Sequence, residues 1–122
     1  MYKAFIVDDD PAIVRGLKKI INWEEYGLDI PETAYNGLEA WKLIETNIPD
    51  IIITDVKMPR IGGLELIRKV KQIKSNTHFI VLSGYDDFEY LKESIKLGID
   101  NYILKPIDVE ELKSTIVDIV EK

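Results

Sequence analysis

Short apolar runs alternate with helical patterns along the whole chain. Unbroken apolar stretches are typical of buried strands, whereas apolar residues spaced three or four apart are typical of amphipathic helices. Residues 51–54 (Ile-Ile-Ile-Thr) are apolar on both faces, as expected of a central parallel strand. The run at 30–35 contains Pro31, which restricts it to a sheet edge. The expected strands are residues 4–7, 30–35, 51–54, 79–82 and 101–104.

A segment with helical spacing follows each apolar run. Pro11 fits the first turn of a helix, because its missing N–H needs no partner there. Asn36, Gly62 and Asp108 precede later helices, and Gly98 is placed to cap the end of a helix expected over residues 86–97. The residues expected to face inward are, helix by helix, Ile13, Val14, Leu17, Ile20 and Ile21; Ala40, Trp41 and Ile44; Leu64, Ile67 and Val70; Phe88, Leu91 and Ile95; and Val109, Leu112, Ile116, Ile119 and Val120.

This alternation predicts an α/β fold, a doubly wound parallel sheet covered by helices on both faces. The length of 122 residues fits one domain spanning residues 1–122, and neither a linker nor an internal repeat interrupts it. With 46% hydrophobic and 31% charged residues, the composition is that of an ordinary globular protein. No apolar run is long enough to cross a bilayer and no signal peptide opens the chain, so we expect a cytoplasmic protein without a membrane partner.

Composition also excludes several kinds of site. The chain has no cysteine, which excludes disulfides, thiol catalysis and thiolate metal sites. His78 is the single histidine, so no site can use two imidazoles, and we expect it to be a surface or structural residue. The net charge of −6 argues against direct binding of this surface to nucleic acid phosphates.

Polar residues follow the expected strands at their carboxyl ends. In open α/β sheets, ligands bind beyond these ends. Carboxylates without histidine or cysteine favour a hard cation, of which Mg²⁺ is the usual one. A lysine opposite such acids supplies a cation for a phosphoryl group. The residues that follow the strands are Asp8, Asp9, Asp10, Asp55, Ser83 and Lys105.

These residues predict phosphoryl chemistry on an aspartate. Asp55 is the expected nucleophile, because a carboxylate can form an acyl phosphate when a metal ion offsets the charge of the incoming group. Ser83 would hydrogen-bond that group only once it is present, as a switch requires. We expect Asp10 to act only at the helix start.

Five segments in order along the chain resemble the receiver domains of bacterial two-component response regulators. The resemblance covers essentially the whole chain and implies a flavodoxin-like fold with five strands in the order 2-1-3-4-5. It also implies a cis peptide bond between Lys105 and Pro106. The segments are Ile6-Val7-Asp8-Asp9, Asp55-Val56-Lys57-Met58-Pro59, Gly63, Val81-Leu82-Ser83-Gly84 and Tyr102-Ile103-Leu104-Lys105-Pro106.

The same resemblance implies a function for each residue of the site. Asp55 would accept a phosphoryl group from a histidine kinase. Mg²⁺ would be held by Asp9, Asp55 and the backbone carbonyl of Lys57, with Asp8 acting through water. A lysine departs from the more usual residue at position 57, and its side chain would border the phosphoryl group, so the lifetime of the phosphorylated state stays open.

Switching would follow phosphorylation. By the resemblance, Lys105 contacts the phosphoryl group, and Ser83 and Tyr102 are the switch pair that re-aims the face formed by the fourth helix, fifth strand and fifth helix. Tyr90 and Leu97, with Tyr85, fall outside the expected inward stripe and suggest a homodimer surface there. The domain would not be an enzyme beyond Mg²⁺-dependent self-phosphorylation and slow autodephosphorylation.

A finer resemblance concerns the output of the switch. Residues 22–28 and 83–90 are similar to those of receivers that precede an AraC-type helix-turn-helix domain. The 122 residues contain no such output domain, so we expect them to be part of a longer transcription regulator that binds DNA only through that domain.

Other functions remain open at this point. A haloacid-dehalogenase-like phosphotransferase would use Asp8 as nucleophile and Asp10 as acid/base, but the chain lacks a cap insertion. A non-phosphorylated interaction module would gain stability by losing the clustered acids. A flavin-binding protein would need a phosphate loop where the three aspartates stand.

Overall fold

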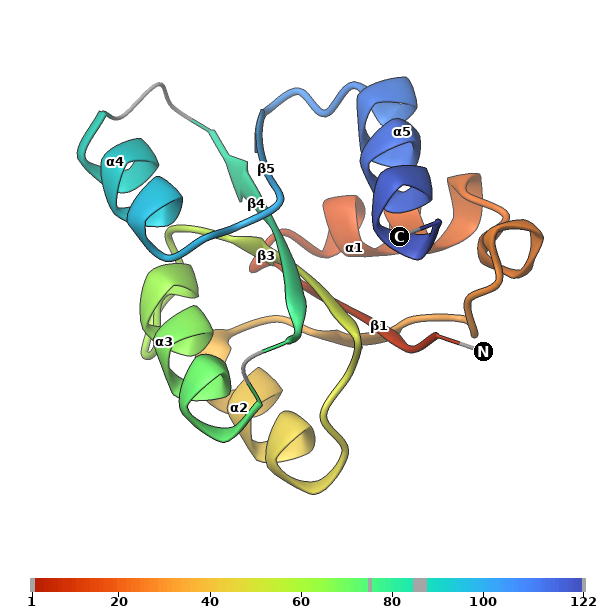
Figure 1. The fold of residues 1–122 in the computed structure, drawn as a ribbon. Helices are drawn as coiled ribbons and strands as arrows, with labels where there is room; N and C mark the ends of the chain where they lie inside the picture. Colours follow the sequence, from red (N-terminus) through yellow and green to blue (C-terminus); the bar gives the residue numbers. More distant parts are fainter. Residues whose placement is uncertain (1, 75, 85–87, 122) are drawn as a thin grey trace.

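Five parallel strands form one sheet in the order β2-β1-β3-β4-β5, which confirms the expected topology (Figure 1). The computed structural model describes residues 2–74, 76–84 and 88–121, with the side chain of Phe88 excepted. The edge strand β2 begins only after Pro31, because proline has no N–H to donate to a neighbouring strand. The strands are β1 (Ala4–Val7), β2 (Glu32–Ala34), β3 (Ile51–Asp55), β4 (His78–Ser83) and β5 (Asn101–Leu104).

Helices cover both faces of the sheet, as predicted. Helices α1 and α5 lie on one face, and α2, α3 and α4 lie on the other (Figure 1). The side chains of Asp10, Asn36 and Asp108 accept hydrogen bonds from backbone N–H groups at the starts of α1, α2 and α5. The helices are α1 (Pro11–Ile20), the 3₁₀ helix η1 (Trp23–Tyr26), α2 (Gly37–Thr46), α3 (Gly63–Ile73), α4 (Phe88–Lys96) and α5 (Val109–Val120).

Alternate residues of each strand enter two separate apolar cores. Ile51 and Ile53 pack with α1 and α5, whereas Ile52 packs with α2 and α3. This follows from the two-residue period of a strand, which sends successive side chains to opposite faces. Because both faces are covered, the central strands are apolar over most of their length, which is why the sequence predicted them well.

The register of the strands brings their carboxyl ends to one edge of the sheet. Val7 pairs with Thr54, and Asp55 pairs with Leu82. Ser83, the last residue of β4, pairs with Leu104. The residues that end or directly follow β1, β3, β4 and β5 therefore lie next to one another.

The prediction of the inward face of α4 was wrong at Ile95, whereas Leu91 is half-buried and the side chain of Phe88 lies outside the described structure. Ile95, expected inside, is 66% exposed, whereas Ser94 is fully buried. Tyr90 and Leu97, expected outside the inward face, pack partly buried against the core beneath α2 and α3. Residues 90, 94 and 97 are spaced three and four apart, as are 88, 91 and 95, so both sets fit one face of a helix. The set that is observed inside contains a serine, and it was therefore not recognised as the apolar face. The expected helix start at 86 and the residue Tyr85 lie outside the described residues.

Ile20 was also wrongly expected to face inward, since it is 61% exposed. It is the last residue of α1, and the chain then turns into extended backbone at Ile21, which is buried.

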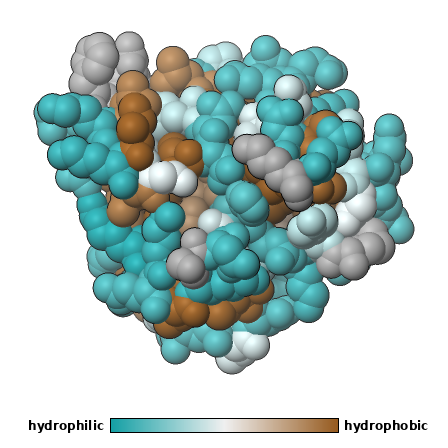
Figure 2. Space-filling view, in the orientation of Figure 1, coloured by the Kyte–Doolittle hydropathy of each residue, from teal (hydrophilic) through white to brown (hydrophobic). Residues whose placement is uncertain are grey.

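The outer surface is mostly hydrophilic, with separate apolar patches on the face shown in Figure 2. Within the described residues, no helix has the length and apolar character needed to span a membrane.

Candidate functional site

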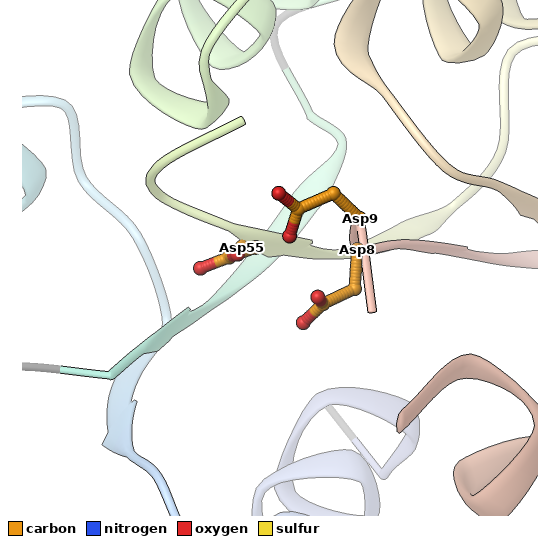
Figure 3. Close-up of side chains that lie close together, drawn as sticks. All are labelled: Asp8, Asp9 and Asp55. Carbon is orange, nitrogen blue, oxygen red and sulfur yellow. The ribbon is translucent and has the colours of Figure 1, made fainter. Parts of the chain in front are cut away.

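Three carboxylates meet at the carboxyl edge of the sheet. Asp8 and Asp9 directly follow β1, and Asp55 ends β3. Each offers an oxygen that lies within 4.8 Å of the oxygens offered by the other two. The side chains of Asp8 and Asp9 project to opposite sides of the end of β1, next to Asp55 (Figure 3). Asp8 and Asp55 are buried and Asp9 is exposed, so the cluster runs from the protein interior to solvent.

Lys105 joins this cluster from the end of β5. Its Nζ lies 2.9 Å from Oδ2 of Asp8 and 3.4 Å from Oδ2 of Asp55. The backbone N–H of Lys105 donates to the carbonyl of Ser83 at 2.7 Å, which ties the ends of β4 and β5 together. The peptide bond from Lys105 to Pro106 is cis, as the resemblance implied.

Burial controls the ionisation of the two inner carboxyls. The pKa of Asp55 is raised to about 6, chiefly because burial disfavours the charged form and then because the charge of Asp8 lies close by; Lys105 opposes the shift. Burial likewise raises the pKa of Asp8. Burial alone would lower the pKa of Lys105, but its contacts with Asp8 and Asp55 raise it instead. An additional cation would therefore stabilise the ionised site.

The donor set fits a hard divalent cation. All candidate side-chain ligands are carboxylate oxygens, which Mg²⁺ prefers. Oδ2 of Asp8 is buried and, within the described residues, accepts no hydrogen bond of good geometry, although the Lys105 ammonium forms an ion pair with it. The charge of this oxygen is thus only partly compensated by the protein, as expected of a group at a metal site.

Backbone contacts fix the two inner carboxylates in place. Asp55 Oδ1 accepts a hydrogen bond from the N–H of Val56 at 2.8 Å, and Asp8 Oδ1 accepts one from the N–H of Asp10 at 2.9 Å. The N–H of Gly63 donates to the carbonyl of Val56 at 3.0 Å. A Cβ on Gly63 would lie 2.1 Å from the backbone oxygen of Asp55. Gly63 therefore lets the start of α3 pack directly on the site, a function that the sequence did not reveal.

A pocket of about 210 Å³ opens beside Asp55. Ser83, Lys105 and Lys57 line it, so four of the predicted site residues share one cavity. Tyr90 lines it as well, and Nζ of Lys57 lies 5.7 Å from the centre of the Tyr90 ring. The place of Tyr90 in this pocket was not predicted, because the residue was expected on the outer face of α4.

Tyr102, the second predicted switch residue, lies on β5 opposite Val81. Its side chain is partly buried against the core beneath α2 and α3. Its hydroxyl is buried and, among the residues described, has no hydrogen-bond partner. The structure therefore places Tyr102 on the α4 side of the sheet, turned inward.

Two polar residues lie outside the site. Asp10 is exposed and its carboxylate accepts a hydrogen bond from the N–H of Ala12 at the start of α1, as predicted. It is therefore poorly placed as the acid/base that a dehalogenase-like enzyme would need. His78 Nδ1 lies 3.1 Å from Asp100 at the amino ends of β4 and β5, away from the carboxylates.

Known proteins are similar to this chain in sequence and in fold. Residues 4–117 match the family model of the response regulator receiver domain. The transcriptional regulatory protein YesN of Bacillus subtilis is 44% identical over 98% of this chain, which spans 33% of YesN. The transcriptional regulatory protein HptR of Staphylococcus aureus is 42% identical over 93% of this chain, which spans 44% of HptR. The chain thus spans about a third to a half of these relatives.

Solved structures agree with the sequence relatives. The REC domain of AraT, a response regulator from Geobacillus stearothermophilus, superposes with a TM-score of 0.90 and 34% identity over 98% of this chain and 93% of that one. A two-component transcriptional regulator AraC from Clostridium phytofermentans gives a TM-score of 0.86 and 31% identity over 99% of this chain and 93% of that one. The chain therefore belongs to the receiver domains of two-component response regulators.

Proposed function

We propose that Asp55 is the phosphoacceptor of this receiver domain and that a histidine kinase supplies the phosphoryl group. The observation that carries the proposal is the position of Asp55. It lines the 210 Å³ pocket and lies 3.4 Å from the Lys105 ammonium. Asp8 is fully buried instead, which makes it a poor nucleophile for a bulky phosphoryl donor.

The acids would hold Mg²⁺ beside this nucleophile. Asp9, Asp55 and the backbone carbonyl of Lys57 are the proposed ligands, with Asp8 acting through a water molecule. The ion supplies positive charge that offsets the negative charge of the incoming group. Receiver domains in general bind Mg²⁺ at an acidic pocket, and the Asp8, Asp9 and Asp55 cluster is consistent with this.

Phosphoryl transfer then needs little further machinery. A carboxylate oxygen of Asp55 attacks the phosphorus of a phosphohistidine, so that an O–P bond forms as the N–P bond breaks. The imidazole of the donor, already protonated on its other ring nitrogen, keeps the electron pair of the N–P bond and leaves as neutral imidazole. Lys105 donates to a phosphoryl oxygen. Later attack by water on phosphorus releases inorganic phosphate and restores the Asp55 carboxylate.

Switching would begin at Ser83. Its hydroxyl would hydrogen-bond a phosphoryl oxygen, a contact that exists only in the phosphorylated state. Ser83 ends β4 and lines the same pocket as Asp55, which supports this step. Tyr102 would then shift on β5, and because its buried hydroxyl has no partner within the described structure, its movement breaks no hydrogen bond there.

The output would be transcription control. The relatives YesN and HptR are named transcriptional regulatory proteins and are longer than this chain. We propose that the α4-β5-α5 face, where Ile95 and Leu104 are exposed, changes on phosphorylation and forms a homodimer or contacts a DNA-binding output domain. In this proposal the domain acts in the cytoplasm, as is typical of response regulators.

Mass spectrometry after treatment with acetyl phosphate and Mg²⁺ tests the phosphoacceptor. We expect one phosphoryl group on the wild-type domain, its loss in Asp55→Ala, and its retention in Asp10→Asn, whose carboxylate lies outside the cluster. Fragmentation should place the group on Asp55. Unchanged labelling of Asp55→Ala would move the nucleophile elsewhere and overturn the proposal.

A further inference from the structure

The described side chains of helix α4 bury little apolar surface. Among its residues with a described side chain, only Ser94 is fully buried, and the hydroxyl of this serine finds no hydrogen-bond partner in the described structure. By contrast, α3 buries Leu64, Leu66, Ile67 and Val70. Buried apolar area is the main source of stability for a packed helix, so the described side chains of α4 contribute less to its anchoring than those of α3 contribute to theirs.

Two side-chain contacts within the described residues link α4 to α3 and to the loop after β3. Arg68 on α3 forms an ion pair with Glu93 on α4. Lys57, in the loop after β3, places its ammonium 5.7 Å from the centre of the Tyr90 ring on α4. These four residues line a groove of about 590 Å³ between the loop, α3 and α4. Both contacts cross this groove, one from α3 and one from the loop after β3.

Lys57 also belongs to the pocket beside Asp55. Both Lys57 and Tyr90 line this pocket together with Asp55, Ser83 and Lys105. A phosphoryl group on Asp55 would therefore enter the space that the Lys57 side chain borders. It would carry close to two negative charges, whereas the face of the Tyr90 ring offers a neutral quadrupole. A lysine ammonium pairs more strongly with the anion, through charge-assisted hydrogen bonds.

We propose that Lys57 connects the phosphorylation site to helix α4: its ammonium moves from the Tyr90 ring to the phosphoryl group on Asp55 and thereby releases its contact with α4. The inference rests on the proposed function, because it requires the acyl phosphate at Asp55. It adds a second route from the site to α4, beside the one through Ser83.

Amide hydrogen exchange of residues 90–97 tests this connection. The decisive variant is Lys57→Met, which keeps the length and apolar stem of the side chain and removes its charge. The matched control is Lys69→Met, since Lys69 lies 5.2 Å from the ring of Trp41, on the α2–α3 side of the domain. Lys57→Arg keeps a cation at position 57.

Without phosphorylation, we expect exchange in α4 to be about two- to fivefold faster in Lys57→Met than in the wild type, the factor that an exposed cation–π contact provides. Lys69→Met and Lys57→Arg should match the wild type. After treatment with acetyl phosphate and Mg²⁺, exchange in wild-type α4 should rise by a similar factor, and Lys57→Met should show a smaller rise.

The intact mass of the same samples separates the two proposals. A wild-type domain that gains no phosphoryl group overturns the proposed function at Asp55. Equal exchange in unphosphorylated Lys57→Met and Lys69→Met overturns the connection through Lys57, whatever the phosphorylation result. A phosphorylated wild type whose α4 exchange stays constant also overturns the connection, while the function of Asp55 stands.

Discussion

Nζ of Lys105 lies 3.4 Å from Oδ2 of Asp55, yet the pKa of Asp55 is raised to about 6. The cation therefore does not compensate fully for burial and for the nearby charge of Asp8. An isolated aspartate has a pKa of 3.8, so the folded domain holds a proton on Asp55 over a pH range in which the unfolded chain has lost it. The ionised site is under electrostatic strain that a metal ion or a proton relieves.

This strain predicts how stability depends on pH. The contribution of Asp55 to the free energy of unfolding is fully present below pH 3.8 and is lost as the pH rises through about 6. In the metal-free domain at pH 7, Asp55→Asn should therefore raise the free energy of unfolding by about 1–3 kcal/mol. Near pH 4 this gain in stability should largely vanish. Urea unfolding at both pH values measures the gain, and a gain of equal size at both would contradict the raised pKa of Asp55.

Magnesium should stabilise the domain by binding the folded state alone. At a concentration one hundred times its dissociation constant, the gain is about 2.7 kcal/mol. Asp9→Asn should remove most of this gain with little effect on the metal-free domain, because Asp9 is exposed. The neighbouring Asp10→Asn should retain it, since asparagine also caps a helix well. Thermal unfolding with and without Mg²⁺ measures this gain. Equal unfolding midpoints of the wild type in the two conditions would refute the metal site.

The sheet and the strand-end residues were predictable because both are encoded locally. Residues 51–54 are apolar on both faces, and a parallel sheet always delivers its carboxyl ends to one edge. Asp8, Asp55 and Lys105 thus could be placed together from their positions after three strands, and their distances agree.

Contacts between segments could not be predicted in the same way. The approach of Gly63 to the Asp55 carbonyl depends on how α3 packs after its loop, and a glycine before a helix has an ordinary explanation as a helix start. The face of α4 was missed because a buried serine is a weak signal. Helical periodicity is recognised from the spacing of apolar residues, so the apolar Ile95 was expected inside and the polar Ser94 was not.

Replacing Gly63 tests its contact with the site. In Gly63→Ala the new Cβ would lie 2.1 Å from the Asp55 carbonyl oxygen, so backbone must shift. We expect a loss of about 2–3 kcal/mol in the free energy of unfolding and slower phosphorylation by acetyl phosphate. Gly16→Ala is the control, because a Cβ added at this exposed position of α1 would meet nothing within 4 Å beyond its chain neighbours and the nearby backbone of its own helix. It should gain about 0.5–1 kcal/mol, and a similar gain in Gly63→Ala would exclude the tight contact.

Removal of the buried hydroxyls of Ser94 and Thr115 should change the free energy of unfolding in opposite directions. Ser94 Oγ has no hydrogen-bond partner in the described structure, so Ser94→Ala removes a desolvated group and should raise the free energy of unfolding by about 1 kcal/mol. Thr115 Oγ1 donates to the Glu111 carbonyl at 3.0 Å and accepts from the Asn101 amide at 2.9 Å.

Thr115→Val keeps the shape of the side chain but abandons both partners, and it should cost about 1–2 kcal/mol. Urea unfolding of the two variants measures the contrast, and amide exchange should locate the gain from Ser94→Ala in α4. A loss of stability in Ser94→Ala comparable to that in Thr115→Val would mean that the serine hydroxyl is hydrogen-bonded in solution. In that case, α4 would be anchored more firmly than its burial indicates.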